Sequence, residues 1–483
     1  MSPKRHRIKH LEFLIHWFGT SNLQHRKKRK TSWLRARHSF FKSLARNQSF
    51  WSELSVLRNR ETVLTTPPQT NKMYFSGGYS SLPRLILVAH SGLPIQFSLF
   101  AELPTWTRIP VMRTMQVLLL AFCFGQVPAA AQNLDIYFID VEGGQATLIV
   151  APSGESMLVD AGWPGFGGRD AERIVTAAHA ANLKRIDYLV VTHYHSDHVG
   201  GVPQLAERFA IGTFIDHGSN VESGQEAEQL FTAYQNTYQF LASSTAARKV
   251  QHRVVTPEYA ISLGEANVQV LTSDGKHAPT CGPTQPSCKA PVQGLTSNGG
   301  YVGTVVQHAG QPNPYCSAVE RRKDDPSENA RSVGILLTFG RFKFIDLGDL
   351  TWNKELDLMC PNNWVGTVDV YLTSHHGLSS SGSKPLVWAL HPRVAIMNNG
   401  ARKGGEPEAW QVVESSPGLK DLWQLHYALA SGKEQNVADS FIANPDEQCA
   451  GKYLKLSAQA DGSFKVTNAR NGFSKAYPAV PVR

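Results

Sequence analysis

Residues 192–201 read THYHSDHVGG and continue directly from the apolar run 188–192, YLVVT. The apolar run has the composition of a buried strand, so three histidines and an aspartate fall within six residues at a strand end. Neutral imidazoles and a carboxylate are the usual ligands of Zn²⁺ and similar ions. Histidine accounts for only 18 of the 483 residues, which disfavours a chance cluster. The stretch therefore predicts a metal site at the edge of a sheet.

The spacing within this stretch divides its side chains into two groups. Side chains of an extended strand repeat every second residue, so His193 and His195 point the same way. A turn at Ser196 would direct Asp197 and His198 toward a second ion. The two glycines that follow allow the backbone to turn tightly before the next helix.

Two later segments repeat the pattern of an apolar strand followed by ligands. Residues 342–349, FKFIDLGD, end in Asp349, and residues 368–374, VDVYLTS, run into His375 and His376. If these strands lie in stacked sheets with a common edge, their ends converge. Asp349 would then bridge two cations, and His376 would complete the second site.

These motifs occur in the order H-x-H-x-D-H, then G-D, then S-H-H-G, which resembles the metallo-β-lactamase fold superfamily. Within it, the sequence is most similar to the branch that contains the extracellular hydrolase domain of the competence protein ComEC. The similarity covers about residues 134–400. It implies an α/β fold of the αββα sandwich type, with the metal site at the sheet edge.

The resemblance also implies a role for each motif residue. Asp349 would bridge two ions, the first of which is bound by His193 and His195. Asp160, in LVDAG, matches an aspartate that supports the ligands after an early strand. The implied cofactor is one or two Zn²⁺ ions, with Mn²⁺ or Fe as alternatives. The full set of implied ligands is His193, His195, Asp197, His198, Asp349 and His376.

The sequence departs from the superfamily pattern at one ligand. Many members have another histidine between the first motif and the bridging aspartate, where this chain reads NARS and Asn329 stands near the expected position. His217, at another strand end, could replace that histidine, and His375 is an auxiliary candidate beside His376. Other histidines that could do so are His252, His277 and His308.

The implied chemistry is hydrolysis. A bound cation lowers the pKa of a water from about 15.7 toward about 7, and Asp197 and Asp349 would be the catalytic carboxylates that orient it. We therefore expect an exported metal-dependent hydrolase, with a phosphoester or phosphodiester as the favoured small-molecule substrate.

Alternatives of the same and of other classes remain open. The same fold could hydrolyse a lactone or a β-lactam. A non-catalytic metal-binding or scaffold protein with a decayed site is a further alternative, although the intact first motif argues against it. An iron redox enzyme is disfavoured because no flavin-binding domain is evident. An S-x-x-K match at residues 381–384 has no K-T-G partner for a serine enzyme.

The basic charge of the chain lies in its first quarter. The net charge is +9, yet residues 1–111 alone carry 18 Lys and Arg against 4 Asp and Glu. The rest has a net charge of −5, so it presents no broad electrostatic footprint for nucleic acid. Residues 1–111 show no sustained helix or strand period, and we interpret them as a basic preamble that is disordered or not translated in the native protein.

Residues 112–131 have the pattern of a secretory signal peptide. A short basic start precedes the apolar run 116–124, and a run of alanines precedes Gln132. The apolar run is too short for a membrane span, and no other run approaches the ~20 residues that a span needs. We therefore expect a periplasmic or secreted protein without a transmembrane anchor. The sequence does not define its oligomeric state.

The remaining chain divides into a domain and an extension. We expect residues 132–400 to form the hydrolase domain, with a long Gly-, Pro- and Cys-containing insertion at 272–330. Within the domain, a similar order of strands and helices recurs in 134–216 and 332–397, which indicates two similar halves. Residues 401–483 are predicted to pack on the domain as a C-terminal extension that ends in a hairpin.

Five cysteines follow the predicted cleavage site. An exported chain permits disulfides, and Cys281 and Cys288, which flank a Pro-containing loop, are the pair that we expect to form one. The odd number leaves at least one free thiol. The cysteine spacings do not make a zinc ribbon.

The signal-peptide hypothesis predicts the start of the native protein. Its first residue should lie near Gln132, because export removes the preceding segment. Peptide mapping of the native protein by mass spectrometry measures this directly. Recovery of peptides from residues 1–111 would contradict the prediction.

Overall fold

The computed structural model describes residues 133–243, 250–278, 294–295 and 310–481. The predictions for the basic preamble, the signal peptide, the Cys281–Cys288 pair and His308 therefore lie outside the described residues.

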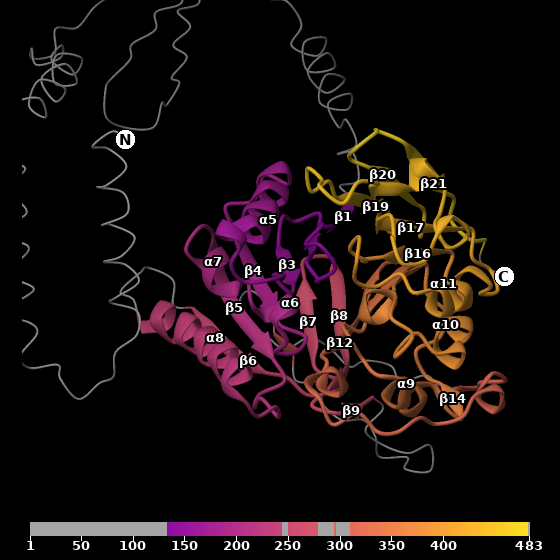
Figure 1. Cartoon of the computed structure of the whole chain (residues 1–483), viewed down its shortest axis with the longest axis horizontal. Helices are drawn as coiled ribbons and strands as arrows, with labels where there is room; N and C mark the ends of the chain where they lie inside the picture. Colours follow the sequence, from indigo (N-terminus) through magenta and orange to yellow (C-terminus); the bar gives the residue numbers. More distant parts are fainter. Residues whose placement is uncertain (1–132, 244–249, 279–293, 296–309, 482–483) are drawn as a thin grey trace, which may run out of the picture. The chain divides into compact units, whose positions relative to one another are not determined.

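Two large β-sheets lie at the centre of the described part of the chain (Figure 1). The first sheet has the strand order β21-β20-β19-β1-β2-β3-β4-β5-β6. Strands β3 to β6 of this sheet run parallel, and its other neighbours pair antiparallel. Its strands are β1 (Leu134–Phe138), β2 (Thr147–Val150), β3 (Ser156–Val159), β4 (Arg185–Val190), β5 (Ala210–Asp216), β6 (Gln251–Val254), β19 (Leu454–Ala458), β20 (Phe464–Asn468) and β21 (Ser474–Tyr477).

The second sheet has the order β10-β7-β8-β12-β13-β15-β16-β17-β18, with β9 paired to β8. From β13 to β18 its neighbouring strands run parallel. Its strands are β7 (Ala260–Leu263), β8 (Ala266–Ser273), β9 (Lys276–His277), β10 (Gly294–Leu295), β12 (Gly334–Phe339), β13 (Phe342–Asp346), β15 (Val370–Leu372), β16 (Val394–Met397), β17 (Asp421–His426) and β18 (Ile442–Asn444). A separate small sheet pairs β11 (Gln311–Pro312) with β14 (Asn362–Asn363).

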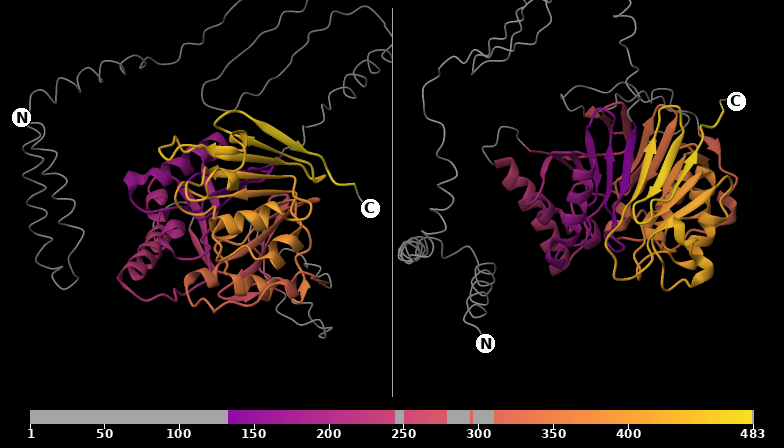
Figure 2. Two further views of the ribbon diagram at one scale, coloured as in Figure 1. Left: turned by 45° about the vertical axis from the view of Figure 1, so that its right-hand side comes forward. Right: turned by 90° about the horizontal axis from the view of Figure 1, so that it is seen from above.

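Helices cover the outer faces of the two sheets (Figure 2). One set packs on the first sheet, namely α5 (Arg169–Ala180), α6 (Ser196–Val199), α7 (Val202–Ala206) and α8 (Gln225–Ser243). The other packs on the second sheet, namely α9 (Trp352–Met359), α10 (Lys384–Leu390) and α11 (Pro407–Glu414). Short 3₁₀ helices are η2 (Phe166–Gly168), η3 (Cys316–Ala318), η4 (Glu328–Arg331), η5 (Ser374–Gly377), η6 (Lys433–Gln435) and η7 (Asp439–Phe441). The layers run helix, sheet, sheet, helix, so the predicted αββα sandwich is confirmed.

The alternation of side chains along β1 shows how one strand serves two cores. Leu134, Ile136 and Phe138 are buried in the cluster between the sheets. Tyr137 points to the opposite face and belongs to the cluster beneath the helices of the first sheet. Because both faces of the sheet are covered, apolar residues occupy both sides of the strand instead of alternating with polar ones.

The segment after residue 400 is more closely integrated than the sequence indicates. Strands β17 and β18 continue the second sheet, and β19 pairs with β1 along its length, from Leu134 opposite Ala458 to Phe138 opposite Leu454. The hydrogen-bonding edge of β1 would otherwise be free. The C-terminal strands therefore complete both sheets.

The described residues also bear on disulfide pairing and on membrane crossing. Cys316 and Cys360 form a disulfide, a pair that the sequence analysis did not single out, and it joins the insertion to the end of α9. In the part of the chain that the structure describes, no helix combines the length and apolar character that a membrane crossing requires.

The sheet pairing predicts that the C-terminal strands contribute to stability. Leu456→Ala in β19 should lower the free energy of unfolding by about 2–5 kcal/mol, because a fully buried leucine leaves a cavity. Leu429→Ala is the matched control, because that leucine is 46% exposed and its loss should cost less than about 0.5 kcal/mol. Chemical denaturation of the full chain measures both. Equally small effects would show that β19 adds little to the core.

Candidate metal centre

The candidate site lies where strand ends from the two sheets meet. In the first sheet, Asp160 directly follows β3 and His193 comes shortly after β4. In the second sheet, Asp349 follows β13 and His376 follows β15. Neighbouring parallel strands end at the same edge of a sheet, where α/β proteins place their ligands. The convergence that the sequence predicts is present in the structure.

Four buried residues form a compact group of potential ligands, with one atom of each within 4.8 Å of the others: Asp197, His198, Asp349 and His376. The Asp197 Oδ2 atom lies 3.2 Å from His198 Nε2 and 3.1 Å from His376 Nε2. The two imidazole nitrogens are 3.2 Å apart. Asp349 Oδ2 lies 3.3 Å from the His198 nitrogen, and Asp349 Oδ1 lies 3.3 Å from the His376 nitrogen. Tetrahedral bonds of about 2.0–2.2 Å place ligand atoms about 3.3–3.6 Å apart. The group therefore has nearly the spacing that one divalent ion requires.

The hydrogen bonding of this group also fits a cation. The facing nitrogens of His198 and His376 can share only one proton between them. The Asp349 Oδ1 atom is buried and has no hydrogen-bond partner among the described residues. Buried polar atoms normally have partners, and an unsatisfied one calls for an explanation. A metal ion would satisfy all three atoms at once.

The charges of the centre favour replacement of a proton by a metal ion. Burial alone would lower the pKa of His198, but the carboxylates of Asp349 and Asp197 raise it well above its ordinary value. Burial would raise the pKa of each carboxylate, yet the nearby imidazoles hold both well below the ordinary range. Burial lowers the pKa of His375 to about 4 and holds the pKa of His193 well below its ordinary value. A proton on His198 thus supplies positive charge that a divalent ion would supply more fully.

Asp160 lies behind His198, on the side away from the other potential ligands. Its Oδ2 atom lies 2.7 Å from His198 Nδ1, and its carboxylate accepts hydrogen bonds from both the backbone and the side chain of Thr192. The bond at Nδ1 leaves His198 Nε2 facing the other ligands. Asp160 has a positive φ of 60°, a strained conformation that commonly marks functional sites.

The first two histidines of the motif face each other beside this group. His193 Nε2 lies 3.0 Å from His195 Nδ1 and 3.9 Å from Asp349 Oδ2. His195 Nε2 is 2.8 Å from Glu222 Oε1, so its Nδ1 is the atom turned toward the centre. These side chains could contribute to a second ion on the other side of Asp349.

His375 also lies at the centre. Its Nε2 atom is 3.3 Å from Asp349 Oδ2, and its Nδ1 lies 2.9 Å from the hydroxyl of Ser380. His375 and His376 both have left-handed backbone angles, with φ of 53° and 57°. The hydrogen bond from the Gly405 backbone N–H to the His376 carbonyl helps to hold this strained turn.

The remaining candidates for the missing histidine lie elsewhere. His217 Nε2 lies 2.9 Å from Glu328, and its ring packs against Tyr194. His252 pairs with Asp216, and His277 lies close to a backbone carbonyl. Asn329, the auxiliary candidate near the position of the missing histidine, lies in η4. Its buried Oδ1 atom has no hydrogen-bond partner among the described residues.

Sequence reasoning missed three charged residues around the centre. Lys403 donates from its ammonium group to Asp197 Oδ2, and the same group lies 5.1 Å from the Trp163 ring. Glu222 contacts His195, and the buried Glu328 accepts hydrogen bonds from the backbone of Tyr194 and of a neighbouring loop. Lys403 and Glu222 come from loops and Glu328 from the short 3₁₀ helix η4, none of which shows apolar periodicity, so no local pattern identified them.

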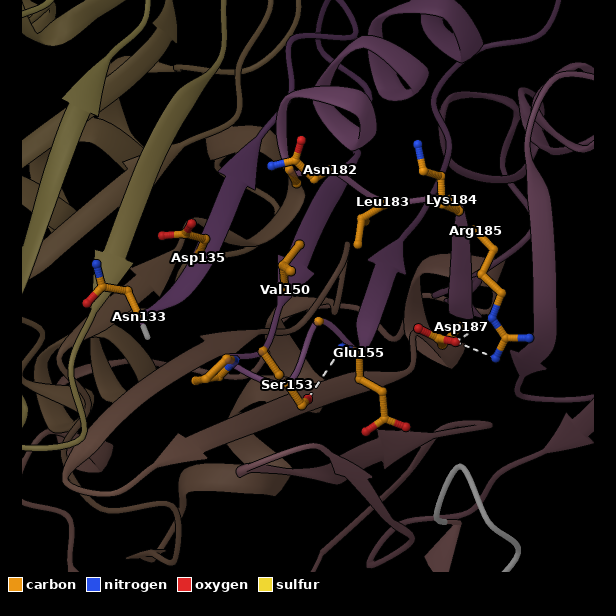
Figure 3. A pocket seen from close by; sticks show the side chains of 14 residues that line it. Asn133, Asp135, Val150, Ser153, Glu155, Asn182, Leu183, Lys184, Arg185 and Asp187 are labelled. Atoms are coloured by element: carbon orange, nitrogen blue, oxygen red, sulfur yellow. Dashed lines mark hydrogen bonds and ion pairs between the residues drawn. The ribbon is translucent and has the colours of Figure 1, made fainter. Parts of the chain in front are cut away.

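A separate hollow of about 730 Å³ lies at the opposite end of the strands (Figure 3). It is lined by the start of β1, the β2–β3 turn and the segment between α5 and β4. Of its three carboxylates, Asp187 is paired with Arg185 at 2.7 Å and accepts a hydrogen bond from the Ser156 backbone N–H. Its place and pairing set it apart from the metal centre.

Comparison with known proteins supports the class of the fold. Residues 139–319 match the family described as the metallo-beta-lactamase superfamily, so the chain contains a domain of that superfamily. The match includes the first histidine motif and ends before Asp349. Members of the superfamily are generally metal-dependent hydrolases. No curated protein matches the chain.

Several solved structures are similar at low identity. The metallo-beta-lactamase fold protein YhfI from Bacillus subtilis is 9% identical, with 60% of this chain and 95% of that chain covered and a TM-score of 0.33. CmlA from Streptomyces venezuelae, a diiron beta-hydroxylase, is 16% identical, with 59% and 47% covered and a TM-score of 0.31. A Cronobacter sakazakii metallo-beta-lactamase mutant is 11% identical, with 50% and 78% covered and a TM-score of 0.28. Identities and TM-scores this low carry no argument about activity.

The contact between Asp160 and His198 generates a test of the metal centre. Asp160→Asn should weaken Zn²⁺ binding by about 10–100-fold, because a carboxylate behind a ligating imidazole orients it and raises its basicity. Competition titration of the full chain against a chelating dye measures the affinity. Asp446→Asn, at an exposed position, is the matched control and should leave the affinity unchanged. Equal affinities in the two variants would contradict a supporting role for Asp160.

Proposed function

We propose that this protein is a metal-dependent hydrolase of anionic esters, with phosphodiesters and phosphomonoesters as the favoured substrates. The observation that carries the proposal is the buried group Asp197, His198, Asp349 and His376, whose ligand atoms have the spacing of one divalent ion, with the ammonium group of Lys403 beside it. The first feature supports a hydrolytic metal, and the second supports a negatively charged substrate.

The ligand set supports two ions that share Asp349. One would be held by Asp197, His198 and His376 together with an Asp349 oxygen. The other would be held by His193 Nε2, His195 Nδ1 and Asp349 Oδ2. His375 Nε2, 3.3 Å from Asp349 Oδ2, is the imidazole best placed to stand in for the missing histidine. Imidazole and carboxylate donors suit Zn²⁺, and they also suit Fe or Mn²⁺.

A divalent ion bound here would act as a Lewis acid and would lower the pKa of its water. The side chains of the protein do the rest. Asp197 accepts a hydrogen bond from the attacking water and so orients it, while Asp160 keeps His198 in the required tautomer. Lys403, whose side chain is 29% exposed at the rim, stabilises the negative charge that develops on the phosphoryl oxygens.

The finer parts of the proposal concern family branch and location. Membership of the ComEC-like branch is supported by the G-D and S-H-H-G motifs and accords with phosphodiester hydrolysis. Export is supported by the signal-like segment 112–131. The negative charge of the chain after this segment favours small phosphoesters over long nucleic acids.

A substrate panel tests the proposed function. The full chain, loaded with Zn²⁺, Mn²⁺ or Fe²⁺, should hydrolyse bis(p-nitrophenyl) phosphate or p-nitrophenyl phosphate, and Asp197→Ala should lose both activity and bound metal.

Lys403→Met should lower kcat/KM for the phosphodiester by about 10–100-fold, because a hydrogen bond to a charged group is worth about 1.5–3 kcal/mol. Any loss in turnover of a neutral lactone should be smaller, because Lys403 then acts only through its contact with Asp197. Lys433→Met, at an exposed position, is the control.

The outcomes distinguish the alternatives. Turnover of a lactone or of a chromogenic β-lactam without turnover of either phosphate would replace the proposed substrate class. Bound metal without hydrolysis of any substrate in the panel would contradict the enzymatic proposal and favour a metal-binding scaffold.

A further inference from the structure

A second group of metal-binding side chains lies outside the proposed hydrolytic centre. Asp140 and Glu142 follow β1, His426 is the last residue of β17, and Cys449 lies between β18 and β19. One ligand atom from each lies within 4.8 Å of the others, although 309 residues separate Asp140 from Cys449. Apart from the disulfide-bonded pair, Cys449 is the cysteine present within the described residues.

The separations between these atoms resemble those of a tetrahedral site. Cys449 Sγ lies 3.2 Å from Asp140 Oδ2, 3.5 Å from Glu142 Oε1 and 3.9 Å from His426 Nε2. His426 Nε2 lies 2.8 Å from Asp140 Oδ1 and 3.7 Å from Glu142 Oε2. Zinc bonds of about 2.0 Å to nitrogen and oxygen and about 2.3 Å to sulfur place ligand atoms about 3.3–3.8 Å apart. The separations run from 2.8 to 3.9 Å around this range. Those from Cys449 Sγ are to Asp140 Oδ2 and Glu142 Oε1, and those from His426 Nε2 are to the other oxygen of each carboxylate, so a bound ion would take one oxygen of each.

Arg173 leaves part of each carboxylate available to an ion. Its guanidinium donates to Asp140 Oδ2 at 2.9 Å and to Glu142 Oε1 at 3.1 Å. The other oxygen of each carboxylate faces His426 Nε2. Asp140 Oδ1 also accepts a hydrogen bond from the Glu142 backbone N–H at 2.9 Å, and the guanidinium lies 3.6 Å from Cys449 Sγ. Arg173 therefore acts as an outer partner that orients the two carboxylates, an arrangement that is common around metal ligands.

Burial and charge also favour a divalent ion. Asp140 and His426 are fully buried, and His426 Nδ1 has no hydrogen-bond partner among the described residues, so the polar contacts of this ring are made at Nε2. Two carboxylates and a thiolate carry three negative charges, which Arg173 and one divalent ion would neutralise. A coordinating metal deprotonates a thiol, so Cys449 would bind the ion as a thiolate.

We infer that Asp140, Glu142, His426 and Cys449 form a second metal site for a thiophilic divalent cation such as Zn²⁺, independent of the proposed hydrolytic function. A thiolate ligand selects Zn²⁺ over Mg²⁺ or Ca²⁺. The site joins three segments that are distant in the sequence: the loop after β1, the end of β17 and the β18–β19 connection.

The position of the site gives it a structural role next to the hydrolytic centre. The loop that begins at Asp140 passes directly behind that centre, where the Gln145 backbone N–H donates to the Asp197 carbonyl at 3.1 Å. A Cβ atom added at Gly144 would lie 2.4 Å from the same carbonyl oxygen, so only glycine at this position lets the loop lie this close to Asp197. An ion at the second site would fix this loop against β17.

Cobalt substitution tests the site without relying on activity. The full chain, freed of metal by a chelator under reducing conditions and titrated with Co²⁺, should develop the near-ultraviolet charge-transfer band of a cobalt–thiolate bond. The proposed hydrolytic centre contains no cysteine, so it cannot produce this band. Cys449→Ser should lose the band completely and bind one ion fewer per chain by elemental analysis. The double variant Cys281→Ser/Cys288→Ser is the matched control and should keep the band.

A second variant keeps the test decisive if Cys449→Ser fails to fold. Glu142→Gln lies at the partly exposed rim of the group and should retain the band while Co²⁺ binds about tenfold or more weakly. Absence of the band in the wild-type protein would overturn the inference. A band that persists in Cys449→Ser, or is lost in the control, would also overturn it by assigning the thiolate to another cysteine.

Discussion

The structure depends on a concentration of buried charge where strand ends of the two sheets meet. Asp349, which follows a strand of the second sheet, lies 3.3 Å from His198, which follows a strand of the first, and Asp197 completes the same group. Ionised carboxylates are costly to bury unless positive charge lies beside them. A proton on His198 meets that requirement in part, and a divalent ion would meet it more fully. This need for positive charge beside the carboxylates accounts for the histidines and for the approach of Lys403. It also accounts for the strained backbone at Asp160 and His376, which holds these side chains at the centre.

The sandwich supplies the precision that the charges require. Apolar side chains from both sheets pack between them, so the strand ends cannot separate without exposing the core. Parallel strands on each side deliver their following loops to one edge. The C-terminal strand β19 closes the free edge of β1, which anchors the loop that passes behind Asp197. Fold and site are therefore coupled through β1, which contributes to the core and to the edge pairing, and through the loop after it, which contacts the Asp197 carbonyl and carries Asp140 and Glu142.

Much of the fold could be read from local patterns, and the failures have physical causes. Apolar runs such as 188–192 and 368–374 predicted β4 and β15 because a doubly covered strand is apolar on both faces. The strand β17 (Asp421–His426) was not predicted, although Trp423 is fully buried in it. Its sequence DLWQLH alternates apolar residues with Asp, Gln and His, so it lacks the continuous apolar run of the other buried strands. The hydrogen bonds that accommodate those polar residues come from distant loops, as when His426 meets Asp140. Long-range partners of this kind leave no local periodicity.

The sequence by itself determined the order of the motifs that converge at the sheet edge, and the resemblance of those motifs to the metallo-β-lactamase superfamily implied the αββα class. It did so because strand composition and ligand spacing are local properties of neighbouring residues. The tertiary structure alone decided which histidine stands beside Asp349, which lysine contacts Asp197 and that Cys449 meets His426 and Asp140. Those contacts join residues that are far apart along the chain, and only the packing of the two sheets brings their side chains within bonding distance.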